Sequence, residues 1–285
     1  TTEIYTLSLH DALPIYGVKR ALSIVDEALE AGQGPVSSLG PLIHNRQVVD
    51  RLKERGLAEV ASPAEAETGA LVIRSHGVGP QAFDEARGAG LTILDATCTF
   101  VKRAQQAARD FVEQGFETFI VGEADHPEVV AIVAWTEGQA RVFDPLQEPP
   151  VPKGSKLAVV AQTTQNLATL QQATSYLLNY ARELHIANTV CGATTNRQQA
   201  AEKLAREVDV LVVVGGFHSA NTRRLAQIGS EITTTHHVET AEEVKASWFE
   251  GAGRVGVTAG ASTSQEILDE VVQRIVALGK QLEQE

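Results

Sequence analysis

Short apolar runs alternate with longer amphipathic stretches along most of the chain. The runs that predict strands are rich in Val, Ile and Leu and cover residues 71–74, 91–94, 116–121, 157–160, 208–214 and 255–258. The stretches with helical periodicity cover residues 18–31, 46–55, 102–114, 167–184, 198–208 and 266–282. Strands that alternate with helices are typical of βα units, in which helices cover mostly parallel sheets. The sequence therefore predicts an α/β fold.

Polar, glycine-containing loops follow five of these strands. They cover residues 75–80, 122–128, 162–166, 215–222 and 259–264. Open α/β sheets bind ligands at the carboxyl ends of their strands, so we expect a ligand site in these loops. Ordinary turns would also be polar. However, they would not explain the concentration of His, Ser, Thr and Asn.

The composition and net charge of the chain argue against several classes of protein. The 285 residues are 43% hydrophobic, and 24 basic against 36 acidic side chains give a net charge of −12. We expect no membrane span, because no run approaches the ~18 consecutive apolar residues that a span needs. We also expect no nucleic-acid partner, because the chain is acidic and lacks a Lys/Arg stripe. Two cysteines do not make a disulfide framework, so we expect a reducing compartment and a cytoplasmic protein.

Residues 1–15 have neither a helical nor a strand period, and they lack the features of a targeting segment. One choice of codons for these fifteen residues spells a string that resembles a common short-read sequencing adapter. The chain also contains no methionine, even at position 1. We therefore expect residues 1–15 to be an artefact outside the fold, and the native sequence to begin near Tyr16.

The sequence contains no convincing example of the common cofactor-binding or catalytic motifs. A G-x-G-x-x-G string at residues 251–256 precedes a strand instead of joining a strand to a helix, so we interpret it as a chance match. The adjacent His236 and His237 are better explained as a solvated strand end than as a metal site. No Walker loop, G-x-S-x-G elbow or HExxH motif is present in the sequence.

Several predicted helix starts carry groups that could bind an anion. His126 and Glu128 flank a proline where a helical pattern begins, which capping alone would explain. The same pair could hold an anion and supply a proton. Ser219, Asn221 and Ser262 also precede helical runs, and uncharged donors beside helix-start amides can bind a diphosphate without Lys or Arg.

Cys98 and Cys191 each follow a predicted strand and precede a helix. Two isolated cysteines are more often buried hydrophobic residues than ligands. Their matched positions favour a shared metal centre, although two thiolates rarely suffice for an iron–sulfur cluster.

A series of motifs from residue 16 onward resembles the 4-hydroxy-3-methylbut-2-enyl diphosphate reductases, the last enzymes of the non-mevalonate isoprenoid pathway. The motifs are YGVKRA (16–21), which resembles the end of GFCxGVxRA, IHNR (43–46), SHGV (75–78), DATC (95–98), HPEV (126–129), QTT (162–164), CGATTNRQ (191–198), SANTRRL (219–225) and TAGAS (258–262). They occur in order and with suitable spacing over the whole segment.

The resemblance implies three α/β units arranged as a trefoil around one 4Fe–4S cluster. The units would cover residues 16–98, 99–191 and 192–285, with the first unit lacking its first strand. Cys98 and Cys191 would be two cluster ligands, and the third would fall at position 15, where this chain has Ile15. We therefore expect a truncated chain with a labile cluster and impaired activity.

The resemblance also implies the reaction and its residues. The substrate 4-hydroxy-3-methylbut-2-enyl diphosphate would be reduced to isopentenyl and dimethylallyl diphosphate, with reduced ferredoxin or flavodoxin as electron donor. Glu128, Thr163 and His126 would act in catalysis, with Glu128 delivering protons and Thr163 holding the hydroxyl that leaves. The residues implied in substrate binding are His44, His76, His126, Thr163, Ser219, Asn221 and Ser262. The alternative is a non-catalytic α/β protein that binds a phosphorylated small molecule.

Overall fold

The structure, a computed structural model, describes residues 3–6, 16–32, 34–143 and 154–282. The chain divides into two compact units. The N-terminal unit comprises residues 16–43 and 47–191. The C-terminal unit comprises residues 192–285 together with residues 44–46 and the segment before residue 16.

The first sheet of the N-terminal unit has four parallel strands in the order β3-β2-β4-β5. These strands are β2 (Val36–Leu39), β3 (Leu57–Val60), β4 (Ala70–Ile73) and β5 (Thr92–Asp95). The helices of this segment are α1 (Tyr16–Ala31), α2 (Arg46–Glu54) and α3 (Pro80–Gly88), and a short 3₁₀ helix covers Pro63–Glu65. α1 and α2 pack against Val36 and Val72 on the same side, where they bury Ala21 and Val25.

The second sheet of the N-terminal unit is also parallel, in the order β7-β6-β8-β9. Its strands are β6 (Glu117–Val121), β7 (Arg141–Phe143), β8 (Ser155–Ala161) and β9 (Ala181–Ala187), and its helices are α4 (Thr99–Glu113), α5 (Pro127–Trp135) and α6 (Leu167–Leu178). Phe119 and Val121 face α6, whereas the intervening Ile120 faces α4 and α5. Adjacent residues of a strand point to opposite faces, so the β6 run is buried on both sides.

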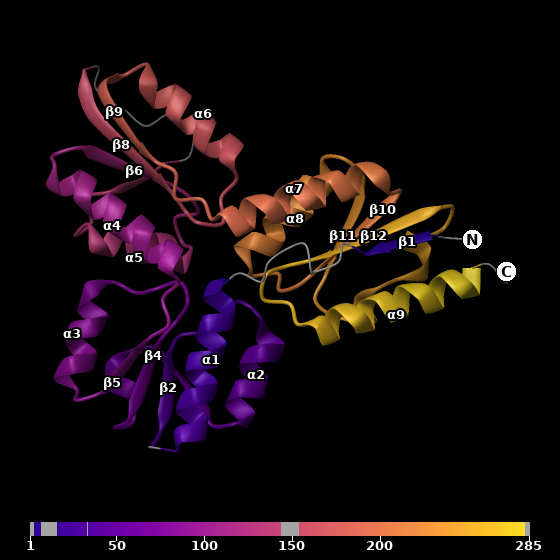
Figure 1. Cartoon of the computed structure of the whole chain (residues 1–285), viewed down its shortest axis with the longest axis horizontal. Helices are drawn as coiled ribbons and strands as arrows, with labels where there is room; N and C mark the ends of the chain where they lie inside the picture. The colour runs from indigo at the N-terminus through magenta and orange to yellow at the C-terminus, as the bar shows by residue number, and fades with distance from the viewer. Residues whose placement is uncertain (1–2, 7–15, 33, 144–153, 283–285) are drawn as a thin grey trace. The chain divides into compact units, whose positions relative to one another are not determined.

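The C-terminal unit has a third parallel sheet, in the order β1-β12-β10-β11. Its strands are β1 (Glu3–Thr6), β10 (Val210–Val214), β11 (Thr234–Val238) and β12 (Arg254–Ala259). Its helices are α7 (Gly192–Glu207), α8 (Ala220–Ser230) and α9 (Gln265–Leu282), with short 3₁₀ helices at Ala241–Glu243 and Ala246–Trp248. Figure 1 shows α9 on one face of this sheet and α7 and α8 on the other. Val212 packs towards α9, and Val213 packs towards α7 and α8.

The three sheets repeat one topology. In chain order, the first strand of each set (β2, β6 and β10) lies between the second and the third. A fourth strand pairs with the outer side of the third, and β5, β9 and β1 occupy this place in the three sheets. The prediction of an α/β fold with three parallel sheets is confirmed. The strands β2–β5, β6–β9 and β10–β12 fall within residues 16–98, 99–191 and 192–285 respectively.

Two expectations about secondary structure were wrong. The helix expected over 167–184 ends at Leu178, and Ala181–Ala187 forms β9 because its backbone pairs with β8. Residues 1–15 were expected to take no part in the fold, but Glu3–Thr6 pairs with Arg254–Val257 of β12. This edge strand is held by main-chain hydrogen bonds, which require no side-chain period.

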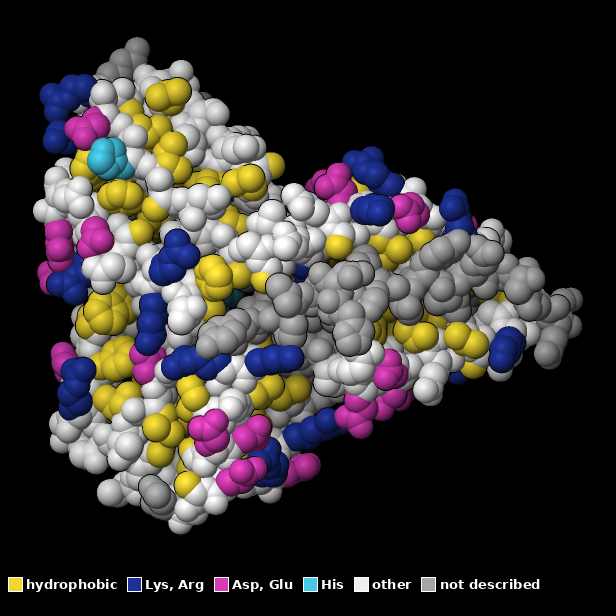
Figure 2. All heavy atoms as spheres, viewed as in Figure 1, with side chains coloured by type: hydrophobic (Ala, Val, Ile, Leu, Met, Phe, Trp, Pro, Cys, Tyr) yellow, Lys and Arg dark blue, Asp and Glu magenta, His cyan; other side chains and the backbone are white. Residues whose placement is uncertain are grey.

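Surface charge is mixed despite the acidic balance. Figure 2 shows Lys and Arg side chains among Asp and Glu on the visible face. Within the described residues, no helix has the length and apolar character needed to cross a membrane.

Candidate active site

The two cysteines stand at equivalent strand-to-helix joints in the N-terminal unit. Cys98 follows β5 and is the N-cap of α4, and Cys191 follows β9 and directly precedes α7. The backbone N–H of Cys98 donates to the carbonyl of Ser75 at 3.0 Å. The N–H of Cys191 donates to the carbonyl of Thr163 at 2.9 Å. Each cysteine is therefore held by the loop that follows the neighbouring strand, β4 or β8.

Both thiols suit a buried metal centre. Cys98 is 8% exposed and Cys191 4% exposed, and no disulfide joins them. Burial raises the pKa of the Cys98 thiol, while the backbone N–H groups of Phe100 and Val101 at the start of α4 act in the opposite direction. The charges of Cys191 and Glu128 also raise the pKa of Cys98, so all three groups lie within electrostatic range. Close thiolates that face backbone donors fit an iron–sulfur cluster, which relieves their mutual repulsion.

The first turn of α1 packs directly against Cys98. A Cβ added to Gly17 would lie 2.7 Å from the Sγ of Cys98 and 2.8 Å from its Cβ. The Arg20 guanidinium donates to the backbone carbonyls of Asp95, at 3.0 Å, and Thr97, at 3.3 Å. α1 is thus fixed against the loop that carries Cys98, and only glycine leaves room for the thiol.

Gly17→Ala is expected to destabilise the protein by about 1–3 kcal/mol, because the new methyl group overlaps the Cys98 side chain. In an unobstructed helix the same change stabilises by ~1 kcal/mol. Gly279→Ala in α9, where a Cβ meets nothing within 4 Å, is the matched control and should raise stability. Urea unfolding of both variants measures the two effects. A stabilised Gly17→Ala variant would contradict this packing.

Internal repetition points to a third joint of the same kind. β1 occupies the sheet position that β5 and β9 occupy, and the next helix along the chain, α1, begins at Tyr16. The residue directly before that helix is Ile15, which lies outside the described residues. Position 15 is therefore equivalent in sequence order to Cys191 before α7.

Glu128 and Thr163 form the best-defined polar pair of the N-terminal unit. Glu128 is 2% exposed, and its two carboxylate oxygens accept from the backbone N–H of Thr163 at 2.6 Å and from Oγ1 at 2.8 Å. Burial raises the pKa of Glu128 to about 7, although the two hydrogen bonds from Thr163 favour the charged form. The carboxyl group is thus poised between its protonated and ionised forms at neutral pH.

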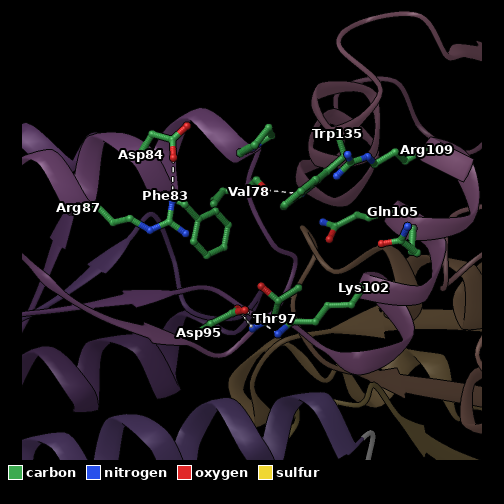
Figure 3. Close-up of a pocket in the computed structure, with 12 residues that line it drawn as sticks. Val78, Phe83, Asp84, Arg87, Asp95, Thr97, Lys102, Gln105, Arg109 and Trp135 are labelled. Atoms are coloured by element: carbon green, nitrogen blue, oxygen red, sulfur yellow. Dashed lines mark hydrogen bonds and ion pairs between the residues drawn. The ribbon is translucent and has the colours of Figure 1, made fainter. Parts of the chain in front are cut away.

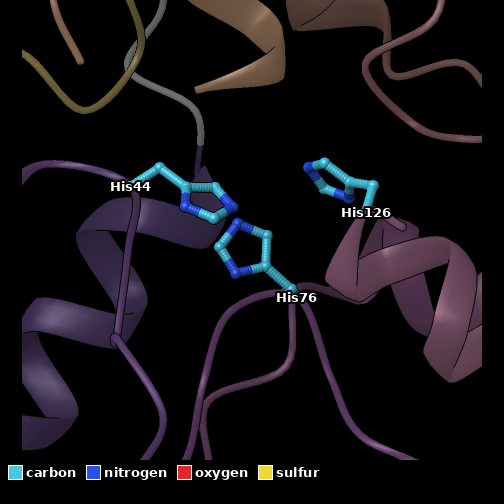
Figure 4. A group of neighbouring side chains, drawn as sticks. All are labelled: His44, His76 and His126. Carbon is cyan, nitrogen blue, oxygen red and sulfur yellow. The ribbon is translucent and has the colours of Figure 1, made fainter. Parts of the chain in front are cut away.

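Two predicted histidines lie together in this unit. His126 is the N-cap of α5, and its Nδ1 accepts from the backbone N–H of Glu128 at 3.2 Å. His76 follows Ser75 in the loop after β4, and its ring meets the His126 ring edge-on, with centroids 5.6 Å apart. Figure 4 shows this pair and also draws His44, which belongs to the C-terminal unit. Helix capping, which the sequence offered as the alternative explanation for this segment, is therefore present at the start of α5.

The remaining predicted residues lie in the C-terminal unit. Ser219 is the N-cap of α8, where its Oγ accepts from the backbone N–H of Thr222 at 3.3 Å. Asn221, in the first turn of α8, is 4% exposed, and among the described residues neither its Nδ2 nor its Oδ1 has a hydrogen-bond partner. The Oγ of Ser262 donates to the carbonyl of His44 at 3.3 Å. The structure thus joins Ser262 to the His44 loop and places Ser219 and Asn221 on one helix turn.

Sequence reasoning missed two residues that build this region. The Nδ2 of Asn45 donates to the carbonyl of Ser262 at 2.7 Å, so Asn45 holds the His44 and Ser262 loops together. Thr222 is fully buried, and a Cβ on Gly260 would meet its Oγ1 at 2.1 Å. Asn45 could have been found from the sequence, because it lies inside the IHNR motif. Nothing in the local sequence predicts the close approach of Thr222 to Gly260.

The expectation that His236 and His237 form a solvated strand end is partly wrong. His236 and His237 lie within β11 and are half-buried. The His236 ring stacks on Trp248 with centroids 3.9 Å apart, and Nε2 of His237 lies 2.7 Å from the Gly215 carbonyl. The G-x-G-x-x-G string at residues 251–256 forms a turn and the start of β12, and so lies ahead of the strand as expected.

Comparison with known proteins agrees with the motif pattern. The model of the LytB protein family matches residues 15–276. A 4-hydroxy-3-methylbut-2-enyl diphosphate reductase of Geobacter metallireducens is 45% identical over 262 residues, which cover 91% of this chain and 93% of the relative. One of Citrifermentans bemidjiense is 46% identical over 268 residues, covering 93% and 94% respectively. Because these alignments cover more than 90% of each relative, they do not support the prediction that the chain is a truncated copy.

Solved structures share the fold. One of (E)-4-hydroxy-3-methyl-but-2-enyl diphosphate reductase is 36% identical, with a TM-score of 0.67 over 97% of this chain and 100% of that chain. The Plasmodium falciparum E-1-hydroxy-2-methyl-but-2-enyl-4-diphosphate reductase has a TM-score of 0.88 over 96% of this chain and 87% of that chain. Its 21% identity supports the fold alone. On the family match and the identity of its relatives, the chain belongs to the LytB family, that of the 4-hydroxy-3-methylbut-2-enyl diphosphate reductases.

Proposed function

We propose that the chain catalyses the reductive removal of the hydroxyl group of 4-hydroxy-3-methylbut-2-enyl diphosphate. The substrate takes up two electrons and two protons, the C–O bond breaks, and water leaves together with isopentenyl or dimethylallyl diphosphate. The observation that carries this proposal is the buried Glu128 carboxyl, bonded to Thr163 and within electrostatic range of the Cys98 thiol. This geometry supports Glu128 as a proton donor and Cys98 as a ligand of a redox centre.

Cys98 and Cys191 would hold a 4Fe–4S cluster, which supplies the electrons and a Lewis-acidic iron for the allylic hydroxyl group. The protein supports this by burying both thiols and by aiming the first amides of α4 at Cys98. A third ligand belongs at position 15, where Ile15 offers none. We therefore propose that the cluster of this chain is labile.

Glu128 delivers a proton to the departing hydroxyl in this proposal. An allylic hydroxide is a poor leaving group, so protonation as the C–O bond breaks is needed. Thr163 holds the substrate hydroxyl with Oγ1, which already reaches Glu128 at 2.8 Å. His126 orients Glu128 through the contact between its Nδ1 and the Glu128 N–H.

The diphosphate would be bound by side chains and helix N-termini. The proposed binding residues are His44, His76, His126, Ser219, Asn221 and Ser262. Asn221 supports this most directly, because both polar atoms of its buried amide lack partners among the described residues. A diphosphate oxygen would accept from Nδ2 beside the start of α8, where backbone amides also favour an anion.

We further propose that reduced ferredoxin or flavodoxin, in the cytoplasm, supplies the electrons. The activity itself is tested without either partner. The chain is loaded anaerobically with iron and sulfide, supplied with dithionite-reduced methyl viologen, and assayed for isopentenyl and dimethylallyl diphosphate. Product above that of a Cys98→Ser variant is expected. Saturable binding of inorganic diphosphate without iron uptake or product would favour the non-catalytic alternative.

A further inference from the structure

A cavity of about 320 Å³ lies in the N-terminal unit beside the loops that carry His76 and Cys98 (Figure 3). Helices α3, α4 and α5 and the end of β5 contribute its lining. Its volume is near the lower end for pockets that bind small molecules. None of the residues that line it has a role in the proposed reaction.

One wall of the cavity is aromatic. The rings of Phe83 and Trp135 lie with centroids 6.3 Å apart at an interplanar angle of 59°. The Nε1 of Trp135 donates to the Val78 carbonyl at 2.9 Å, which fixes the indole in place. Both rings are only half-buried, so they leave apolar surface for a further flat group.

The floor of the cavity carries an unsatisfied donor. Gln105 is 6% exposed, and Figure 3 shows its amide projecting among Val78, Thr97 and Trp135. Among the described residues, nothing accepts a hydrogen bond from its Nε2. A buried donor without a partner is destabilising because it has lost its hydrogen bonds to water, so such a group calls for an acceptor. A ligand oxygen in the cavity would supply one.

The rim of the cavity carries three cationic side chains, Arg87, Lys102 and Arg109. Arg87 pairs with Asp84 at 2.7 Å, Lys102 with Asp95 at 2.5 Å, and Arg109 with Glu113 at 2.6 Å. An ammonium or guanidinium group has several N–H donors, so a cation that is already paired can bond to a second acceptor. Such charge-assisted bonds are stronger to a carboxylate than to a neutral acceptor.

We propose that this cavity binds a small planar aromatic carboxylate. Its ring packs against Phe83 and Trp135, and its carboxylate accepts from Nε2 of Gln105 on the Lys102 side. Thr97 lines the cavity and directly precedes Cys98, so an occupied cavity would restrain the loop that carries this cysteine. The binding step does not depend on the proposed function.

Trp135 provides a direct test, because the chain has only one other tryptophan, Trp248. In a Trp248→Phe variant, 4-nitrobenzoate is expected to quench Trp135 fluorescence with a saturable curve. 4-Nitrobenzyl alcohol, which lacks the charge, should bind at least tenfold more weakly. Cyclohexanecarboxylate, which lacks the flat ring, should not displace 4-nitrobenzoate. Quenching that rises linearly without saturation, or equal affinity for the alcohol, would overturn the proposal.

The role of Gln105 is tested in the same background. Gln105→Leu should weaken 4-nitrobenzoate binding at least tenfold, while the melting temperature stays equal or rises because an unsatisfied donor is removed. Gln171→Leu, at an exposed position of α6, is the matched control and should leave the affinity unchanged. Unchanged affinity in a folded Gln105→Leu variant would show that the amide does not bind the ligand, and the proposal would fail.

Discussion

Glu128→Gln is expected to lower kcat by a factor of about 10²–10³, within the range that a positioned proton donor contributes. The substitution preserves shape, because a glutamine Oε1 can accept from the Thr163 N–H and its Nε2 can donate to Oγ1. The substitution therefore removes only the carboxyl proton that Glu128 could transfer to the substrate. The rate of product formation with dithionite-reduced methyl viologen measures the effect.

The pH profile separates proton donation from a structural role. The raised pKa of Glu128, about 7, means that the protonated donor is abundant below pH 7 and is lost above it. The rate should therefore fall as pH rises through 7, and the Glu128→Gln variant should lack this limb. A variant with an unchanged rate, or with the same alkaline limb, would exclude Glu128 as the donor.

The same pKa has a consequence for stability. The folded state binds this proton more tightly than the unfolded state, since burial raises the pKa from 4.5 to about 7. The contribution of Glu128 to stability is therefore present below pH 4.5 and is lost as pH rises to 7, a change on the order of 3 kcal/mol. Glu128→Gln removes this dependence, so its stability relative to the parent chain should be higher at pH 8 than at pH 5.

The central strands could be predicted from the sequence because their side chains are apolar on both faces. The run that forms β10 is buried at every residue. β2 was missed, since Ser37 and Ser38 are polar yet buried in the middle of a sheet. β9 was taken for the end of a helix because it is half-exposed and its side chains do not alternate clearly. Its strand conformation comes from pairing with β8, and a local pattern does not carry that information.

Residue types at strand ends and the motifs selected Glu128, Thr163 and the two cysteines as candidate site residues. The structure brings these groups within electrostatic or hydrogen-bond range in one unit. The sequence does not show what holds them. The bond from the Cys191 N–H to the Thr163 carbonyl joins residues 28 positions apart, and its counterpart from the Cys98 N–H to the Ser75 carbonyl joins residues 23 positions apart. Such backbone contacts follow from the shared sheet topology.

Ile15→Cys is expected to raise iron and sulfide content towards that of a full 4Fe–4S cluster and to raise turnover at least tenfold. Three equivalent sheet positions are occupied by β5, β9 and β1, and the helices that follow begin directly after Cys98, Cys191 and Ile15. Two of these joints carry thiols, while an isoleucine side chain offers no ligand atom. A third thiolate would strengthen metal binding, because cluster affinity grows with the number of deprotonated ligands.

Metal analysis and the visible spectrum provide the readout for this change, independent of activity. Ser23→Cys, an exposed position on α1, adds a thiol elsewhere and is the matched control. It should leave iron content and the rate of bleaching in air unchanged, whereas Ile15→Cys should slow bleaching. If the parent chain already holds a full cluster that resists air as well as the Ile15→Cys variant does, a ligand other than residue 15 completes the centre, and the equivalence of the three joints does not extend to their chemistry.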